Sequence, residues 1–192
     1  MPGIHAFLAI FIVSTLFAQT VKNETIDAAI AHDDLSDVLL HIRLYPDCLD
    51  HGAHPVLSPL HQSILRKKPE IALALIKAGA DVDRLDGSLR TPLHLCVERG
   101  LLGVAKSLLK VGALPNEWDK AGWTPLHYAA AKDRLNIAQV LIAGGADVKV
   151  LSKQGGSVLH EAAASASAEM VHLILNQGVD PNLVAKDGLS AL

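Results

Sequence analysis

The sequence predicts an all-α solenoid in which short helix-turn-helix units stack side by side and are joined by β-hairpin loops. Two repeated features predict this fold, and both have an interval of 33 residues. One is a glycine, at positions 79, 112, 145 and 178. The other is a four-residue pattern, found at Ser58-Pro59-Leu60-His61, Thr91-Pro92-Leu93-His94, Thr124-Pro125-Leu126-His127 and Ser157-Val158-Leu159-His160. A fixed period of this length indicates a stacked-repeat architecture.

The composition narrows the class of protein. Half of the 192 residues are apolar but only 4% are aromatic, so we expect a core of Leu, Ile, Val and Ala, which suits closely packed short helices. The formal net charge is −3, and the chain has no block of Lys or Arg. Nucleic acid and anionic membrane surfaces attract basic patches, so we expect neither as a partner.

The N-terminal stretch differs from the remainder of the chain. Positions 4–18 form an almost continuous apolar run, and no charged residue precedes Lys22. The run is shorter than the roughly 20 apolar residues that a membrane-spanning helix needs. We therefore expect residues 1–18 to be a signal peptide cleaved between Ala18 and Gln19, with the protein secreted or held in the lumen of the secretory pathway and without membrane attachment after cleavage.

Two alternatives to a signal peptide stay open, because only the α-amino group supplies the positive charge that usually precedes the apolar run. The run could be an uncleaved anchor, or it could extend a cytoplasmic protein. Asn23-Glu24-Thr25 is a glycosylation sequon, so Asn23 is a candidate glycan site if the chain enters the secretory pathway. Cys48 and Cys96 are too few for a disulfide framework, and Cys96 lies where a small buried residue is expected.

The chain divides into units in a regular order. Residues 19–57 contain a divergent first repeat from Thr25 onwards, in which apolar residues still recur at helical spacing. Terminal repeats are usually atypical because one of their faces meets solvent. The following repeats are 58–90, 91–123, 124–156 and 157–189, and 190–192 begins a truncated one.

Turn residues separate the two helices of each unit. A proline suits the first turn of the first helix, and the recurring glycine suits a left-handed cap on the second. The turn between the helices favours left-handed geometry at Lys67, Gly100, Asp133 and Ala166, which costs Lys and Ala about 1 kcal/mol or more. Leu89 occupies the place that glycine takes at 122, 155 and 188.

These repeats resemble the ankyrin repeat family. The resemblance is carried by the opening Thr-Pro-Leu-His, small pairs such as Ala129-Ala130, apolar pairs such as Leu108-Leu109, and a closing Gly-Ala-Asp as at 145–147. It covers 58–189 strongly and 25–57 weakly. It implies a curved solenoid that binds another protein on the concave face formed by the hairpin tips and first helices.

No motif for catalysis or metal binding is complete. The four repeat histidines are expected about 8–10 Å apart along the stack, too far for shared zinc ligation at about 2 Å. His160-Glu161 begins a zinc-protease motif, but Ala164 stands where the second histidine belongs. The sequence has no phosphate-binding loop and no nucleophile elbow. We therefore expect no enzyme, no catalytic residue, no bound metal and no cofactor.

Aromatic residues indicate where a partner would bind. Both tryptophans, Trp118 and Trp123, lie near Tyr128, and Trp and Tyr are enriched among interface hot spots. Leu95 and Glu161 occupy the repeat position of Tyr128 in the flanking units, which the resemblance implies faces the partner. The sequence thus predicts a non-catalytic protein-binding module. Alternatives are a cytosolic adaptor, or the recognition fragment of a longer enzyme or ubiquitin-ligase adaptor truncated at Leu192.

Overall fold

The computed structural model describes residues 20–185, 188, 190 and 191. The predicted signal peptide at 1–18 and Leu192 lie outside the described residues. The helices of the described part are α2 (Ile26–Ala31), α3 (Leu35–Leu44), the 3-10 helix η1 (Pro46–Leu49), α4 (Pro59–Leu65), α5 (Pro69–Ala78), α6 (Pro92–Arg99), α7 (Leu102–Lys110), α8 (Pro125–Ala131), α9 (Leu135–Ala143), α10 (Val158–Ser165) and α11 (Ala168–Leu175).

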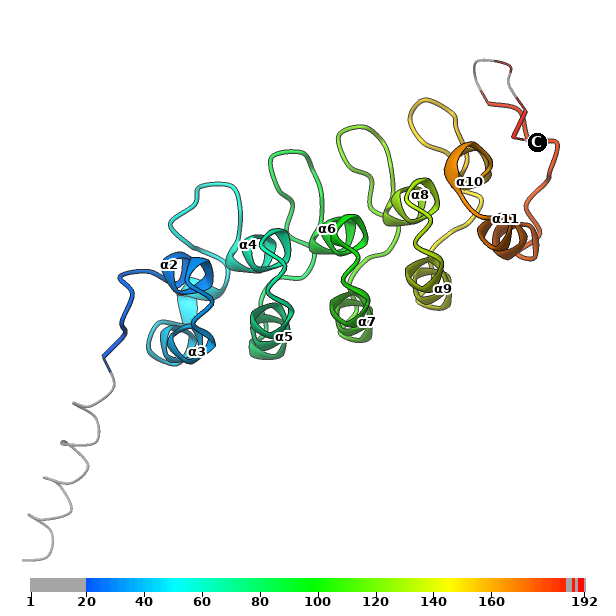
Figure 1. The fold of residues 1–192 in the computed structure, drawn as a ribbon. Coiled ribbons are helices and arrows are strands. Elements are labelled where there is room, and N and C mark those ends of the chain that lie inside the picture. Colours follow the sequence, from blue (N-terminus) through cyan, green and yellow to red (C-terminus); the bar gives the residue numbers. More distant parts are fainter. Residues whose placement is uncertain (1–19, 186–187, 189, 192) are drawn as a thin grey trace, which may run out of the picture.

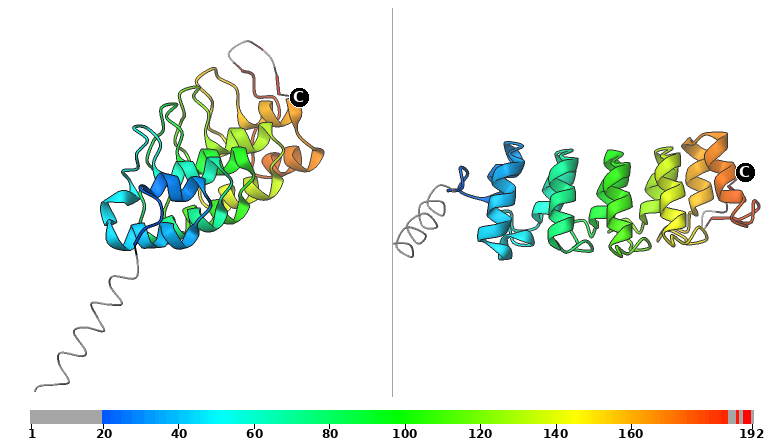
Figure 2. Two further views of the ribbon diagram at one scale, coloured as in Figure 1. Left: turned by 60° about the vertical axis from the view of Figure 1, so that its left-hand side comes forward. Right: turned by 90° about the horizontal axis from the view of Figure 1, so that it is seen from below.

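The helices form two rows. The first helix of each pair lies in one row, α2, α4, α6, α8 and α10, and the second helices lie in the other (Figure 1). Successive pairs stand side by side along the stack, and the connecting hairpins all project to the same side (Figures 1 and 2). The predicted all-α solenoid is confirmed, and strand-like pairing in the described residues is limited to isolated bridges such as Leu151 with Ser157.

The repeated histidine pattern caps the first helices. In α6, Thr91 accepts a hydrogen bond from the His94 backbone N–H, and His94 Nδ1 accepts one from the Thr91 backbone N–H at 3.1 Å. Because Nδ1 accepts, the ring proton is on Nε2, which donates to the Trp123 carbonyl of the next unit at 3.1 Å. Pro92 fills the first helical position, where no N–H is needed. In α6 the pattern therefore starts the helix and also links it to the next unit.

The core runs continuously through the stack. The leucine of each repeated pattern is fully buried, at Leu60, Leu93, Leu126 and Leu159. In the second helices the buried face repeats at helical spacing, for example Ile71, Ala72 and Leu75 in α5. Each inner helix pair contacts the pairs on both sides, so neighbouring units share one core.

The interhelical turns confirm most of the predicted left-handed positions. Lys67 has φ 56°, Gly100 has φ 75° and Asp133 has φ 49°. Ala166 is the exception, with an extended backbone at φ −106° and ψ 170°, so the prediction was wrong there. The extended conformation avoids the left-handed clash of an alanine Cβ, and Ser167 caps α11 by accepting the Met170 N–H.

Two of the remaining predictions on local structure are also met. The recurring glycines 79, 112, 145 and 178 all have φ between 75° and 96°. Leu89, at a position where the other repeats have glycine, has φ 59°.

Within the part of the chain that the structure describes, no helix is both long enough and apolar enough to span a membrane.

The segment before α2 is fixed by a buried carboxylate. Asp37 of α3 accepts hydrogen bonds from the backbone N–H groups of Lys22 (2.8 Å) and Asn23 (2.9 Å) and from Asn23 Nδ2 (2.7 Å). Burial opposes ionisation of Asp37, but these hydrogen bonds outweigh it and lower its pKa. Asn23 Oδ1 also lies 2.7 Å from His32 Nδ1, so the candidate glycan site is held against the first repeat.

Candidate functional site

The hairpins and the first helices that follow them make one continuous surface, which we call the hairpin face. It comprises residues 80–99, 113–131 and 146–165, with residues 179–185 of the last hairpin (Figure 1). Neighbouring hairpins are joined by backbone hydrogen bonds, from Lys120 N to Ser88 O (2.8 Å) and from Lys153 N to Gly122 O (3.3 Å). These bonds tie each of these hairpins to its neighbour.

Buried aspartates fix the shape of two hairpins. Asp86 accepts hydrogen bonds from the backbone N–H groups of Ser88 (2.7 Å) and Arg90 (2.9 Å). Asp119, in the same repeat position, accepts from the Trp123 backbone N–H at 2.9 Å and from the Tyr128 hydroxyl at 2.7 Å. These bonds close each turn and orient the residues just before and after it.

Trp118 belongs to a row of exposed apolar side chains. Leu85, Trp118, Leu151 and Val184 share one repeat position, at an interval of 33 residues, immediately before the hairpin turn. Their side chains are between 43% and 58% exposed. We call these four residues the apolar row. Sequence reasoning singled out Trp118 for its aromatic ring and missed the other three, although the same 33-residue interval would have shown them.

Trp123 and Tyr128 pack against each other. Their ring centroids are 5.0 Å apart with an interplanar angle of 66°, an edge-to-face contact. Burial and the hydrogen bond to Asp119 both raise the pKa of Tyr128. Each side chain is half-buried, so Trp123 and Tyr128 support the hairpin as well as contributing surface.

Leu95 does not lie on the surface. Its side chain is fully buried, so the expectation that it contacts a partner is corrected. The repeat places Leu95 in α6 at the position that Tyr128 has in α8. It does not show that neighbouring side chains cover the shorter leucine. Glu161, in the same repeat position, is half-buried and lines a pocket.

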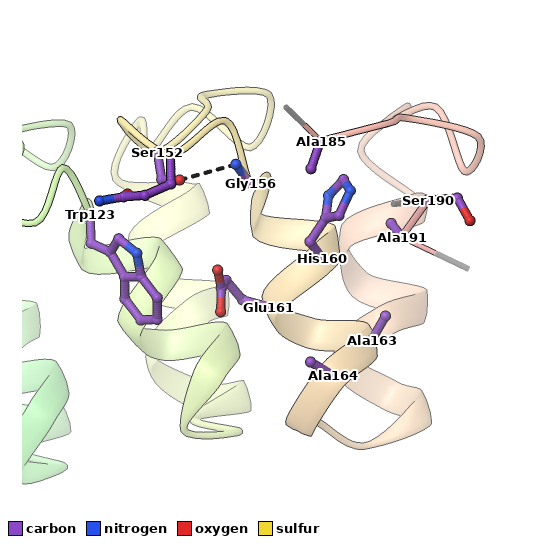
Figure 3. Close-up of a pocket in the computed structure, with 11 residues that line it drawn as sticks. Trp123, Ser152, Gly156, His160, Glu161, Ala163, Ala164, Ala185, Ser190 and Ala191 are labelled. Carbon is purple, nitrogen blue, oxygen red and sulfur yellow. Dashed lines mark hydrogen bonds between the residues drawn. The ribbon is translucent and has the colours of Figure 1, made fainter. Parts of the chain in front are cut away.

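That pocket runs along α10, with Trp123 at one side and Ala185 and Ala191 at the other. It has a volume of about 540 Å³, and its lining includes Trp123, Gly156, Glu161 and Ala164. Figure 3 shows Glu161 extending from α10 towards the side on which Trp123 lies, with the small side chains of Ala163 and Ala164 below. We call it the Trp123–Glu161 pocket.

The repeat histidines form hydrogen bonds with the residues that cap their own helices. Each Nδ1 lies 2.7–2.9 Å from the hydroxyl of its own cap, in His61, His94, His127 and His160. Among the residues that the structure describes, no group of three or more His, Cys, Asp or Glu side chains could hold a metal ion. Cys96 is buried as expected, and burial raises the pKa of its thiol.

The paired helices, hairpins and regular period define a helical-repeat solenoid, a class whose extended surfaces are used for binding. A family model described as ankyrin repeats (three copies) matches residues 26–119, 60–152 and 111–185. The chain therefore belongs to the ankyrin repeat family, whose members in general bind other proteins and are non-catalytic. A search of curated proteins found no match to the chain.

Proposed function

We propose that this protein is a non-catalytic binding module whose protein partner docks on the hairpin face. The observation that carries the proposal is the apolar row, Leu85, Trp118, Leu151 and Val184. Single exposed apolar side chains are ordinary, but one at the same position in each of four successive hairpins makes a regular apolar row along the stack. Surfaces of this kind, rimmed by polar residues, mark protein interfaces.

The rigidity of the hairpins also supports the proposal. A partner that docks on a preformed surface loses less free energy to ordering of loops and side chains. Here the inter-hairpin backbone bonds and the bonds to Asp86 and Asp119 supply that order in the free protein. The apolar row can therefore contribute binding free energy with little rearrangement.

Trp118→Ala should weaken partner binding by more than about tenfold, because truncating an interface hot spot costs at least about 2 kcal/mol. It should leave the unfolding midpoint nearly unchanged, since Trp118 is 50% exposed. The partner is first identified by a photo-crosslinking amino acid at position 118, and its affinity for each variant is then measured by calorimetry. Leu73→Ala is the matched control, because Leu73 is also exposed but lies on α5, away from the hairpins.

Two results would contradict this assignment. If Trp118→Ala lowers the unfolding midpoint instead of the affinity, the hairpin tip serves the fold. If Leu73→Ala weakens the partner as much as Trp118→Ala does, binding is not confined to the hairpin face.

We also propose that the protein enters the secretory pathway. The support is the length and composition of the N-terminal apolar run. Expression in a secreting eukaryotic host should give a product that begins at Gln19 or within two residues of it, as measured by intact-mass spectrometry. Recovery of the uncleaved chain from the cytosol would favour the cytosolic adaptor instead.

The same mass spectrum reports on Asn23 and on the C-terminus. A glycan replaces one of the two Nδ2 hydrogens, so one N–H remains for the bond to Asp37. The proposed secreted form should therefore show added glycan mass that is lost in Asn23→Gln. A native product extending beyond Leu192 would identify the chain as the recognition part of a longer protein.

A further inference from the structure

One repeat position changes its environment at the end of the stack. Gln62, Leu95, Tyr128 and Glu161 are equivalent by the 33-residue period. The side chains of the first three are either buried or hydrogen-bonded to other residues of the chain. Gln62 Nε2 donates to Asp27 Oδ1 at 2.7 Å, Leu95 is fully buried, and the Tyr128 hydroxyl donates to Asp119. Glu161 is half-buried, yet its carboxylate has no hydrogen bond or ion pair with any residue that the structure describes.

The charged form of the Glu161 carboxylate is destabilised in this setting. Burial raises the pKa of Glu161, which means that the charged form loses solvation in the pocket. A cation placed beside it would restore that lost stabilisation. Among the described residues, the neighbouring His160 favours the charged form of Glu161 but does not outweigh burial, so a stronger cation from outside would fit.

The chain itself shows how a cation occupies the equivalent place two units earlier. Arg90 spans the corresponding surface, and its guanidinium binds Asp86 Oδ2 at 2.9 Å and Glu98 Oε2 at 3.0 Å. The residue equivalent to Arg90 is Gly156, and the residue equivalent to Glu98 is Ala164. The space that Arg90 and Glu98 fill in the earlier unit is therefore left open beside Glu161.

The open space is lined by a carboxylate, Glu161, and by an aromatic ring, Trp123. A Cβ built on Gly156 would lie 3.5 Å from Glu161 Oε1, so the glycine leaves the carboxylate accessible. Trp123 lines the same pocket, on the side towards which Glu161 extends (Figure 3). A planar cation can stack on an indole ring while it hydrogen-bonds to a carboxylate.

We propose that the Trp123–Glu161 pocket binds an arginine side chain of the protein partner. This rests on the proposed function, because it names the chemistry that the partner presents to one end of the hairpin face. Arginine fits better than lysine, since its guanidinium is planar, stacks on aromatic rings and donates a pair of parallel hydrogen bonds to a carboxylate. The bound guanidinium would stand where that of Arg90 stands in the earlier unit.

The test uses short peptides and the two indole N–H signals of the full chain in NMR spectra. The probe is acetyl-Gly-Arg-Gly-amide, compared with the same peptide carrying citrulline or lysine in place of arginine. The arginine peptide should shift the Trp123 indole signal saturably. The Trp118 indole is the internal reference, because Trp118 does not line the pocket. The signals are assigned with Trp118→Ala.

Citrulline keeps the shape of arginine without its charge, so its peptide should bind at least about tenfold more weakly, given that a hydrogen bond to a charged group is worth about 1.5–3 kcal/mol. The lysine peptide should bind at least about threefold more weakly, because it lacks the planar fork. Equal binding of the citrulline peptide would overturn the charge assignment, and equal binding of the lysine peptide would overturn the choice of arginine.

Two variants test the pocket from the protein side. Glu161→Gln keeps the side-chain shape and should abolish the saturable shift. Gly156→Arg supplies a guanidinium from within the chain and should block the peptide, and Gly156 is not among the glycines with positive φ. Unchanged peptide binding in both variants would sink the proposal.

The peptide result is independent of the search for a partner. If the pocket fails this test while Trp118→Ala still weakens the partner, the hairpin face binds a protein without arginine recognition. If the pocket binds the arginine peptide but Trp118→Ala leaves partner affinity intact, the proposed docking surface is wrong while the pocket stands.

Discussion

Replacing Leu126 with alanine should lower the free energy of unfolding by about 2–5 kcal/mol, the range for truncating a buried leucine. Leu126 is fully buried in α8, which packs against α6, α9 and α10. The cavity would therefore lie at a junction between three units, and the damage would affect two neighbouring interfaces as well as the unit itself.

The matched control is Lys132→Ala. Lys132 directly follows α8 and is exposed, so its change should stay within about 0.5 kcal/mol. Both variants are compared with the parent by chemical denaturation followed by circular dichroism. Equal unfolding midpoints for Leu126→Ala and Lys132→Ala would contradict the 33-residue repeat register, which places Leu126 in the core.

The fold could be predicted because local signals and the repeat agree. Proline at the first helical turn, glycine in the left-handed cap and leucine in the core recur together in Pro92, Gly112 and Leu93. Each signal is weak alone, but the 33-residue interval makes them reinforce one another. The backbone conformation of Ala166 was predicted wrongly because the turn can also be made with an extended residue at this position. Ser167 then caps the following helix.

The candidate site was less accessible from the sequence. Exposure of Trp118 follows from its place beside a hairpin turn, but the burial of Leu95 depends on which side chains cover it in three dimensions. The Trp123–Glu161 pocket depends on side chains that are small, at Gly156 and Ala164. A missing side chain carries little signal until the structure shows which atoms would have met it.

Acid should destabilise this protein through three buried histidines, His61, His94 and His127, most strongly through His127. Burial lowers the pKa of His127 to about 4, against an ordinary value of 6.5. The ring is fully buried and its Nδ1 accepts from the Thr124 backbone N–H at 3.3 Å, so the fold holds it neutral. Between pH 6.5 and 4 the unfolded chain binds more protons at this site than the folded chain does. Lowering the pH therefore favours unfolding.

The expected loss from His127 alone is roughly 3 kcal/mol across that interval, at 1.36 kcal/mol per pKa unit. It is measured by denaturation of the parent and of His127→Gln at a series of pH values. Carboxylates titrate in both proteins, so the difference between the two stability curves isolates the histidine. The variant should be less stable at pH 7, where its cap is weakened, and the two curves should converge as the pH falls towards 4.

His172→Gln is the control for this experiment, because His172 is exposed near the end of α11 and changes no buried cap. Its stability curve should run parallel to that of the parent throughout. Parallel curves for His127→Gln as well would mean that the fold does not hold the His127 imidazole neutral. In that case the cap described for α8 would have to accommodate a charged ring, and its Nδ1 could not be the acceptor for the Thr124 N–H.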